Sequence, residues 1–274
     1  MPDRIPRSTK TVAVRTGHAL KSAYRTMHYL RDFLTFRRLS NRFPQRFPIR
    51  WRDRLPCLAE RMTATPFDPH YIYHPAWAAR VLARIRPEYH VDISSTLHFC
   101  SIVSAFIPVR FFDFRPADLR LDNLFTGGAD LLSLPFPDGS IPSLSCMHVL
   151  EHVGLGRYGD PLDPVGDRKA AGELKRVLSQ GGTLLAVVPV GRPRIQFNAH
   201  RIYSFDQASD LFAGLKLEEF SLITDLPRDG GFIPEASRTL ADAQSYGCGC
   251  FWFTKPIGGK SPSDKLSEWR IDTP

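Results

Sequence analysis

The stretch ADLLSLPFPDGSIPSLSCMHVLEH, residues 129–152, decides the fold. Its first half is rich in Pro, Gly, Ser and Asp, which are typical of turns. Its second half holds the apolar run 144–150, which is short and bounded by turn residues, as expected of a buried strand in a central sheet. His148, Glu151 and His152 lie at the end of that run. The stretch therefore predicts a turn, a buried strand and a polar group at the strand's carboxyl end.

Strand and helix patterns alternate on both sides of this stretch. Strands are expected at 88–93, 108–113, 183–188, 216–223 and 250–254, and helices at 77–85, 97–105, 169–178 and 205–211. Such alternation indicates βαβ units and a mainly parallel sheet, hence an α/β fold. Ligands of these sheets bind beyond the carboxyl ends of the strands. Residues that end strands are therefore the candidate site residues.

Length and composition fit one large domain or two small ones. The 274 residues are 43% hydrophobic and 23% charged, which excludes a mainly disordered chain. No apolar run approaches the roughly 20 residues that span a bilayer. The cysteines are five in number, Cys248 and Cys250 form a lone CxC pair, and no signal peptide precedes them. These features favour a cytoplasmic protein with free thiols and without a metal site.

The net charge of +8 is unevenly distributed. Residues 1–54 hold fourteen Arg or Lys and three Asp, a net charge of +11, whereas the remainder carries −3. Within this basic arm, apolar residues recur every three or four positions, as on one face of an amphipathic helix; they are Leu20, Ala23, Tyr24, Met27, Leu30 and Leu34. Pro44 and Pro48 predict a non-helical connector over 41–49. The expected domains are an arm with its connector over 1–55 and an α/β domain over 56–274.

Four interpretations of the arm remain open. The helix can pack on the body with its arginines solvated, lie on an anionic membrane surface, dock on a protein partner, or bind nucleic acid. Nucleic acid is the least favoured, because the rest of the chain is mildly acidic. The expected location is cytoplasmic, with peripheral membrane contact through residues 1–54 as an alternative.

Acidic residues lie at the ends of two expected strands. Asp92 closes the first strand and Asp113 the second, 21 residues later. A carboxylate about 20 positions after the first strand can accept hydrogen bonds from both ribose hydroxyls of a nucleoside-like cofactor. The spacing therefore favours a nucleoside-containing ligand near Asp113.

Several motifs together resemble class I S-adenosylmethionine-dependent methyltransferases. They are the Ala129-Asp130 turn, the runs LPFPDGS (134–140) and HVLEH (148–152), and the segment 173–189 with its Gly-Gly turn and apolar strand. The resemblance is closer still to the domain-of-unknown-function family 268, in GLGRYGDPLDP (154–164), FNAHRIY (197–203) and YGCGC (246–250). It covers residues 64–256. It implies a doubly wound, mainly parallel, seven-stranded Rossmann-like sheet with an antiparallel last hairpin.

The resemblance implies a cofactor site for S-adenosylmethionine built from five residues: Asp92, Ser94, Asp113, Asp130 and Leu131. The first two lie at the methionine end, the third at the ribose and the last two at the adenine. The glycine-rich first loop of the family is replaced here by DISSTLH (92–98), which contains no glycine. Serine carries a Cβ and rarely adopts a positive φ, so a fold that has lost the cofactor is the alternative.

The candidate catalytic residues are His148, Glu151, His152 and His200. Histidine titrates near neutral pH and suits removal of a proton from an oxygen or nitrogen acceptor. By the resemblance, His148 faces the transferable methyl group. Glu151 and His152 can act as a base and its orienting partner, or simply cap the following loop.

The candidate substrate-binding residues are Arg157, Tyr158, Asn198 and Arg201. Amide and guanidinium groups suit a polar or anionic acceptor such as a saccharide, and the long loop around Arg157 is typical of a segment that covers a substrate. The leading hypothesis is methyl transfer from S-adenosylmethionine to a polar small molecule or saccharide, without a metal. The alternative is a non-catalytic scaffold with this fold, whose basic arm contacts a membrane surface or a partner.

Overall fold

The structure is a computed structural model that describes residues 7–44, 47–225 and 231–257, with side chains of the first helix described from residue 21 onward. The chain divides into two compact units, Met1–Pro66 and Phe67–Pro274. This division lies later than the expected boundary after residue 55. No helix in the described ranges is long and apolar enough to cross a membrane.

The first unit is one long helix followed by an irregular segment. Helix α1 spans Arg7–Ser40, well beyond the expected amphipathic run, and a 3₁₀ turn, η1, spans Trp51–Asp53. The later segment returns along α1, because Trp51 packs edge-on against Phe33 at 5.0 Å and Arg61 pairs with Asp32. Residues 41–44 and 47–49 have no regular structure, as expected of the connector.

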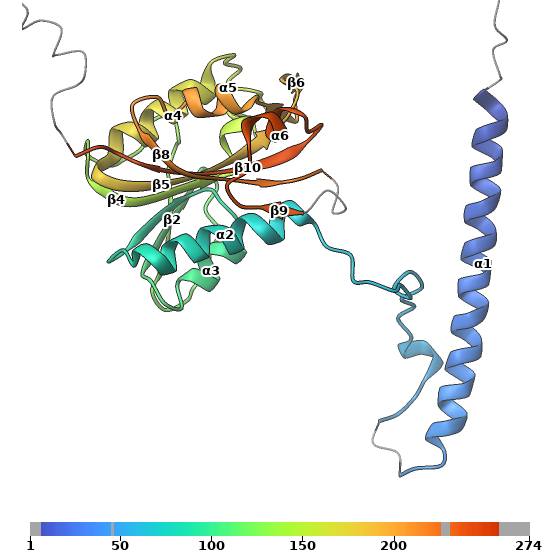
Figure 1. Ribbon diagram of the computed structural model, residues 1–274. Helices are drawn as coiled ribbons and strands as arrows, with labels where there is room; N and C mark the ends of the chain where they lie inside the picture. The colour runs from blue at the N-terminus through green and yellow to red at the C-terminus, as the bar shows by residue number, and fades with distance from the viewer. Residues whose placement is uncertain (1–6, 45–46, 226–230, 258–274) are drawn as a thin grey trace, which may run out of the picture. The chain divides into compact units, whose positions relative to one another are not determined.

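The second unit is a sheet covered on both faces by helices (Figure 1). Its strands are β1 (His90–Ile93), β2 (Val109–Asp113), β3 (Leu124–Gly128), β4 (Ile141–Met147), β5 (Leu178–Val190), β8 (Lys216–Ile223), β9 (Phe232–Ile233) and β10 (Gly247–Thr254). They are ordered β3-β2-β1-β4-β5-β10-β8-β9. The strands β1 to β5 are parallel, and β10 runs antiparallel to both β5 and β8. The short strands β6 (Arg194–Gln196) and β7 (His200–Ile202) form a separate hairpin.

Helices α2 (Pro69–Ile85) and α3 (Leu97–Val103) cover one face of this sheet, and α4 (Gly166–Val177), α5 (Phe205–Asp210) and α6 (Arg238–Asp242) cover the other (Figure 1). A 3₁₀ turn, η2, spans Leu150–His152. Each face has its own apolar core. Trp77 and Phe99 pack in the first, and Leu174, Phe212 and Phe251 pack in the second.

The doubly wound, mainly parallel sheet confirms the predicted fold class. The expected count of seven strands is wrong by one, because the two-residue β9 extends the edge beyond β8. Helix α2 begins at Pro69 rather than residue 77, since Asp68 accepts hydrogen bonds from the first free backbone amides, including that of His70 at 3.0 Å. Pro75 inside α2 obscured this earlier start. The strand expected at 144–150 lies at Ile141–Met147.

The order of the strands reverses between β1 and β4. The chain continues from β1 outward to β2 and β3, and then returns to place β4 and β5 on the other side of β1. The connections after β1 and β4 therefore leave the sheet in different directions and open a crevice at its carboxyl edge. This is the place in the fold where a ligand site is expected.

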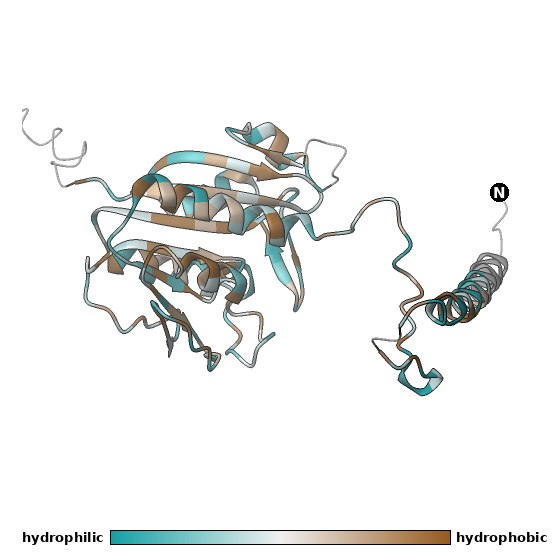
Figure 2. Ribbon diagram, turned by 90° about the horizontal axis from the view of Figure 1, so that it is seen from below, coloured by the Kyte–Doolittle hydropathy of each residue, from teal (hydrophilic) through white to brown (hydrophobic). Residues whose placement is uncertain are grey.

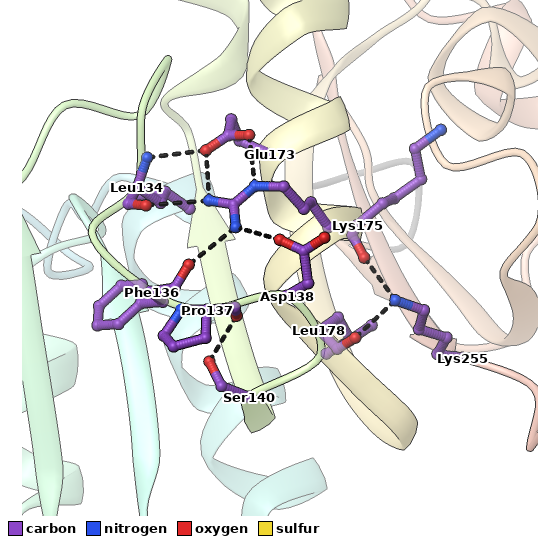
Figure 3. A network of polar contacts seen from close by, with 10 residues as sticks. Leu134, Phe136, Pro137, Asp138, Ser140, Glu173, Lys175, Leu178 and Lys255 are labelled. Atoms are coloured by element: carbon purple, nitrogen blue, oxygen red, sulfur yellow. Dashed lines mark hydrogen bonds and ion pairs between the residues drawn. The ribbon is translucent and has the colours of Figure 1, made fainter.

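The turn 134–140 is fixed to helix α4 by one guanidinium (Figure 3). Arg176 donates to the carbonyls of Leu134 (3.0 Å) and Phe136 (2.8 Å) and to the carboxylates of Glu173 and Asp138, each at 2.7 Å. Glu173 also accepts from the Leu134 amide at 2.9 Å. The turn that leads into β4 is thus held by charge-assisted hydrogen bonds, which are stronger than neutral ones.

Candidate functional site

A cavity of about 450 Å³ lies at the crevice between β1 and β4. Its walls include loop 94–96 after β1, the residues His148, Glu151 and His152 after β4, and Tyr71 and Tyr246 from α2 and the segment before β10. A larger hollow of about 940 Å³ lies elsewhere, between α4, α5 and the β6–β7 hairpin. The smaller cavity is the candidate site, because it occupies the switch point of the sheet and is lined by all four predicted catalytic residues.

The loop after β1 contains a serine in the left-handed conformation. Ser94 has φ of +58°, and its backbone amide donates to the Phe112 carbonyl at 2.7 Å. A non-glycine residue in this region costs about 1–2 kcal/mol. The loop therefore makes the turn that glycine usually makes, although its sequence lacks glycine.

Asp92 organises this loop from inside the protein. It is fully buried, its Oδ2 accepts a hydrogen bond from the Ser145 hydroxyl, and its Oδ1 accepts one from the Ser95 amide at 3.0 Å. Ser145 lies directly opposite Asp92 in the β1–β4 register. Burial raises the pKa of Asp92 to about 6, although the hydrogen bonds from the two serines oppose this shift. Asp92 thus positions the loop that lines the cavity, with both oxygens engaged inside the protein.

The remaining predicted cofactor residues lie beside β2 and β3. Asp113 is half-buried; its Oδ1 accepts from the Arg115 amide at 2.7 Å, and its Oδ2 has no hydrogen-bond partner among the described residues. The Ala129 amide donates to the Asp113 carbonyl at 3.1 Å, which places the turn that carries Asp130 and Leu131 next to Asp113. Asp130 is exposed, whereas Leu131 is largely buried in the core. None of these three predicted residues lines the 450 Å³ cavity.

His148 is held by both of its ring nitrogens. Its Nδ1 lies 2.9 Å from Glu151 Oε1, and its Nε2 lies 3.3 Å from Cys248 Sγ. The His148 side chain is only 5% exposed and that of Glu151 only 1%. Both nitrogens of His148 thus contact protein side chains, Glu151 on one side and Cys248 on the other, and the ring lines the cavity.

Glu151 is a buried carboxylate next to two imidazoles. Burial alone raises the pKa of Glu151, but the hydrogen bond with His148 and the charges of His148 and His152 outweigh it and lower the pKa overall. Its Oε2 is buried and has no hydrogen-bond partner in the described part of the chain. The net result is an ionised carboxylate at the floor of the cavity.

His152 presents one free nitrogen. Its Nδ1 lies 2.6 Å from the Ala199 carbonyl, and since a carbonyl only accepts, Nδ1 carries the proton. In the neutral ring Nε2 is then unprotonated, and it lies 3.8 Å from Glu151 Oε1. Among the four predicted catalytic residues, His152 has the geometry of a proton acceptor.

His200 and the predicted loop residues border the same cavity. His200 Nε2 lies 2.6 Å from Gln196 Oε1, its ring stacks on Tyr246 at 4.8 Å, and burial lowers its pKa. Arg157 donates to the Ala199 carbonyl at 3.1 Å and lies over the Tyr158 ring at 5.1 Å. These side chains make the outer rim of the cavity polar and aromatic.

The structure places the two other predicted substrate residues away from the cavity wall. Asn198 is exposed and does not line the cavity. Arg201 is 5% exposed and donates to the carbonyls of Val153 (2.6 Å), Asp163 and Pro164. Its guanidinium is occupied by the backbone of loop 153–164, which it fixes against β7.

Sequence reasoning missed the contribution of α2. His70 and Tyr71 reach the site from the first turn of this helix, and the His70 ring stacks between His148 (5.7 Å) and Tyr246 (5.2 Å). Burial lowers the pKa of His70 to about 4 and that of His74 to about 3, with the charge of His148 acting in the same direction. The available signal was the His-x-x-x-His spacing, which places both rings on one helix face.

Comparisons with known proteins agree with the predicted family. Residues 141–227 match the model of the family described as "Caenorhabditis protein of unknown function, DUF268". The doubly wound, mainly parallel sheet and the antiparallel β10 are those implied by the resemblance to class I methyltransferases. The sequence matches no curated protein.

Two solved structures illustrate how distant the structural relatives are. The N-methyltransferase NodS from Bradyrhizobium japonicum, in complex with S-adenosyl-l-homocysteine, shares 12% identity over 69% of this chain and 89% of its own, with a TM-score of 0.49. The YcgJ protein from Bacillus subtilis shares 17% identity over 67% of this chain and 100% of its own, with a TM-score of 0.46.

Proposed function

We propose that this chain, a class I methyltransferase fold with a DUF268 segment at its centre, transfers a methyl group from S-adenosylmethionine to a polar small molecule or saccharide. The observation that carries the proposal is the composition of one cavity. Loop 94–96, which belongs to the predicted cofactor site, and His152, which can accept a proton, line the same 450 Å³ space. A methyl donor and an acceptor bound to these walls would meet inside it.

The residues of the chain fit the proposed cofactor in two respects. Ser94 makes the left-handed turn that lets the backbone bend around a ligand. Asp113 Oδ2, which has no hydrogen-bond partner among the described residues, can accept from ribose hydroxyls. When bound, S-adenosylmethionine supplies an electrophilic methyl group on a sulfonium. Asp113 and Asp130 would hold its nucleoside part, and loop 94–96 its amino-acid part.

His152 is the proposed general base. Its Nε2 can take the proton of an acceptor hydroxyl or amine, because Nδ1 is fixed as the donor to Ala199. The imidazolium that forms would lie 3.8 Å from the ionised Glu151, whose charge stabilises it. Glu151 therefore acts through His152, and His148 keeps Glu151 in place.

The acceptor is proposed to be polar because of the rim. Arg157, Tyr158 and His200 offer guanidinium, hydroxyl and imidazole groups around the cavity. Such groups form directional hydrogen bonds with hydroxyl-rich or anionic molecules. A saccharide or a similar polar metabolite matches this chemistry better than an apolar acceptor does.

Isothermal titration with S-adenosylmethionine and S-adenosylhomocysteine tests the cofactor. Micromolar binding is expected for the full chain, and Asp113→Ala should bind at least about tenfold more weakly, because hydrogen bonds to a charged group contribute about 1.5–3 kcal/mol. Asp118→Ala, an exposed carboxylate in the loop after β2, is the control and should bind like the unaltered chain. Absence of binding at millimolar concentration would favour the scaffold alternative.

A second candidate function belongs to α1. Tyr24, Met27 and Leu34 are 59–63% exposed and lie on one side of this basic helix. Figure 2 shows that the described part of the helix carries both hydrophobic and hydrophilic residues. Exposed apolar residues flanked by Arg and Lys suit the surface of an anionic membrane. Peripheral binding to anionic lipid is therefore the function proposed for the arm.

Vesicle co-sedimentation tests this second function. The full chain should bind vesicles that contain anionic lipid at low salt and release them at high salt, since the attraction is electrostatic. The double variant Met27→Asp/Leu34→Asp should lose binding. Phe36→Asp, at an equally exposed residue on the opposite side of α1, is the matched control. Equal binding by both variants would contradict the proposal.

A further inference from the structure

Three side chains that can ligate metals meet around His148. His70 lies in the first turn of α2, His148 follows β4, and Cys248 lies in β10. One ligand atom of each lies within 4.8 Å of the others, and the cluster is buried, with Cys248 at 0% and His70 at 9% exposure. The elements that supply the three residues are far apart in the sequence and are joined only by the fold.

We propose that His70, His148 and Cys248 bind a transition-metal ion of the zinc type, which clamps the first turn of α2 to the sheet. Zn²⁺ takes imidazole nitrogen and thiolate sulfur at about 2.0–2.3 Å in tetrahedral geometry, which separates two ligand atoms by roughly 3.3–3.6 Å. His148 Nε2 and Cys248 Sγ already have this spacing, at 3.3 Å. The ligand nitrogen of His70 has to move closer by at most about 1.5 Å, which is within reach of a side-chain rotation.

Glu151 orients His148 for this role. With Nδ1 donating to the Glu151 carboxylate at 2.9 Å, the lone pair of the neutral ring is on Nε2, on the side of Cys248. Metal-binding histidines almost always donate their other nitrogen in this manner, often to a carboxylate. Glu151 is a positioning residue in this site, because it acts on the metal only through His148.

His74, one turn further along α2, has a ring nitrogen near this cluster that is unpaired among the described residues. Its Nδ1 lies 2.6 Å from the His70 carbonyl and therefore carries the proton, which leaves a lone pair on Nε2. That nitrogen is buried and has no hydrogen-bond partner in the ranges that the structure describes, although its ring lies 5.0 Å from that of His148. Buried polar atoms are rarely left unpaired. The ligand atoms of His74 are not part of the 4.8 Å cluster, so the proposed site rests on His70, His148 and Cys248.

The burial of Cys248 argues against a different use of the same residues. Cys248 contacts His148, which in turn contacts Glu151, and thiol enzymes arrange their nucleophile, base and orienting acid in the same way. However, Cys248 is 0% exposed and does not line the cavity, so a substrate in the cavity cannot reach its sulfur. A metal ion needs only the three side chains themselves, with the thiol proton leaving to solvent on binding.

The clamp would set one wall of the cavity. Tyr71, next to His70, lines the cavity, so fixing the first turn of α2 fixes this wall. The proposal revises the expectation of no metal site, in which His70 was not considered as a ligand. It does not depend on methyl transfer, because metal binding is measured without cofactor or acceptor.

Cobalt binding to the full chain tests the site. The protein is stripped with a chelator and titrated with Co²⁺, which should produce one equivalent of binding with a thiolate-to-cobalt charge-transfer band that Zn²⁺ abolishes by competition. Cys248→Ser should lose this band. Cys146→Ser removes an equally buried thiol from β4, in the core of the opposite face, and should retain it.

Two further variants keep the test decisive if Cys248→Ser does not fold. His70→Ala, near the surface of the first turn of α2, should weaken Co²⁺ binding at least tenfold while the band remains at saturation. Glu151→Gln should weaken it by about 10–100-fold, the usual effect of losing such an orienting partner. A chain without the cobalt band, or variants of Cys248 and His70 that bind like Cys146→Ser, would overturn the proposal.

Discussion

Replacing Asp92 by Asn keeps the shape of a buried, hydrogen-bonded side chain but removes its ability to ionise. The pKa of Asp92 is raised from 3.8 to about 6 by burial. In the unfolded chain this carboxyl loses its proton near pH 4, whereas the folded protein holds the proton up to about pH 6. The folded state therefore binds more protons between these values, and the stability contributed by Asp92 falls as the pH rises through this window.

The size of the effect follows from the shift. About two pKa units at 1.36 kcal/mol each correspond to about 3 kcal/mol, all of it lost above pH 7. The free energy of unfolding of Asp92→Asn, relative to the unaltered protein, should therefore rise by about 3 kcal/mol from pH 3 to pH 8, and by roughly 1.5 kcal/mol from pH 5 to pH 8.

Urea denaturation at pH 5 and pH 8 measures this difference. Asp118→Asn, whose side chain is 81% exposed, is the control, and its effect on unfolding should change little between the two pH values. If the stability of Asp92→Asn relative to the unaltered protein stays constant or falls with pH, Asp92 is not the desolvated carboxyl described above, and the account of how loop 94–96 is held is wrong.

Three further predictions concern the turn, the long loop and the proposed base. Arg176→Ala should lower the free energy of unfolding by about 2–4 kcal/mol in urea denaturation, because it removes charge-assisted hydrogen bonds to the turn and to Glu173. Arg176→Lys should restore less than half of this lost stability. Gly154→Ala should cost more than about 2 kcal/mol in thermal unfolding, since its Cβ would lie 2.1 Å from the Asp163 carbonyl oxygen. Gly159→Ala, also at positive φ but in open space, should cost only about 1–2 kcal/mol, and equal costs would count against a close packing of the loop. His152→Gln should lower kcat about 10²–10⁴-fold once an acceptor is found, with cofactor affinity unchanged in titration; a change confined to KM would exclude it as the base.

The sequence was sufficient for the fold because its local signals agree with its topology. The apolar run 183–188 lies within β5, which extends on both sides to Leu178–Val190, and β8 lies where the pattern predicted it, at Lys216–Ile223. Strand β3, by contrast, was missed, because Leu124–Gly128 ends in two glycines and looks like a turn. Only pairing with β2 makes it a strand.

The candidate site was predicted only in part, because local sequence does not show which side chains a fold brings together. Glu151 and His152 follow a strand directly, so their place at the carboxyl edge could be foreseen. The approach of His70 to Cys248 could not, since 177 residues separate them and Pro75 obscured the helix that carries His70. Arg201 was misjudged for a related reason, because nothing local reveals that its guanidinium binds the backbone of loop 153–164.

The hydrogen bonds of Arg176 indicate that the turn 134–140 serves the stability of the fold. The residues of this turn are held by helix α4 through the Arg176 guanidinium, and none of residues 134–140 lines the cavity. A protein with this fold but without catalytic activity would still need this turn in order to fold, so its sequence would be kept. The turn thus reports on the fold, whereas the chemistry that a chain with this fold can perform depends on the residues around the cavity.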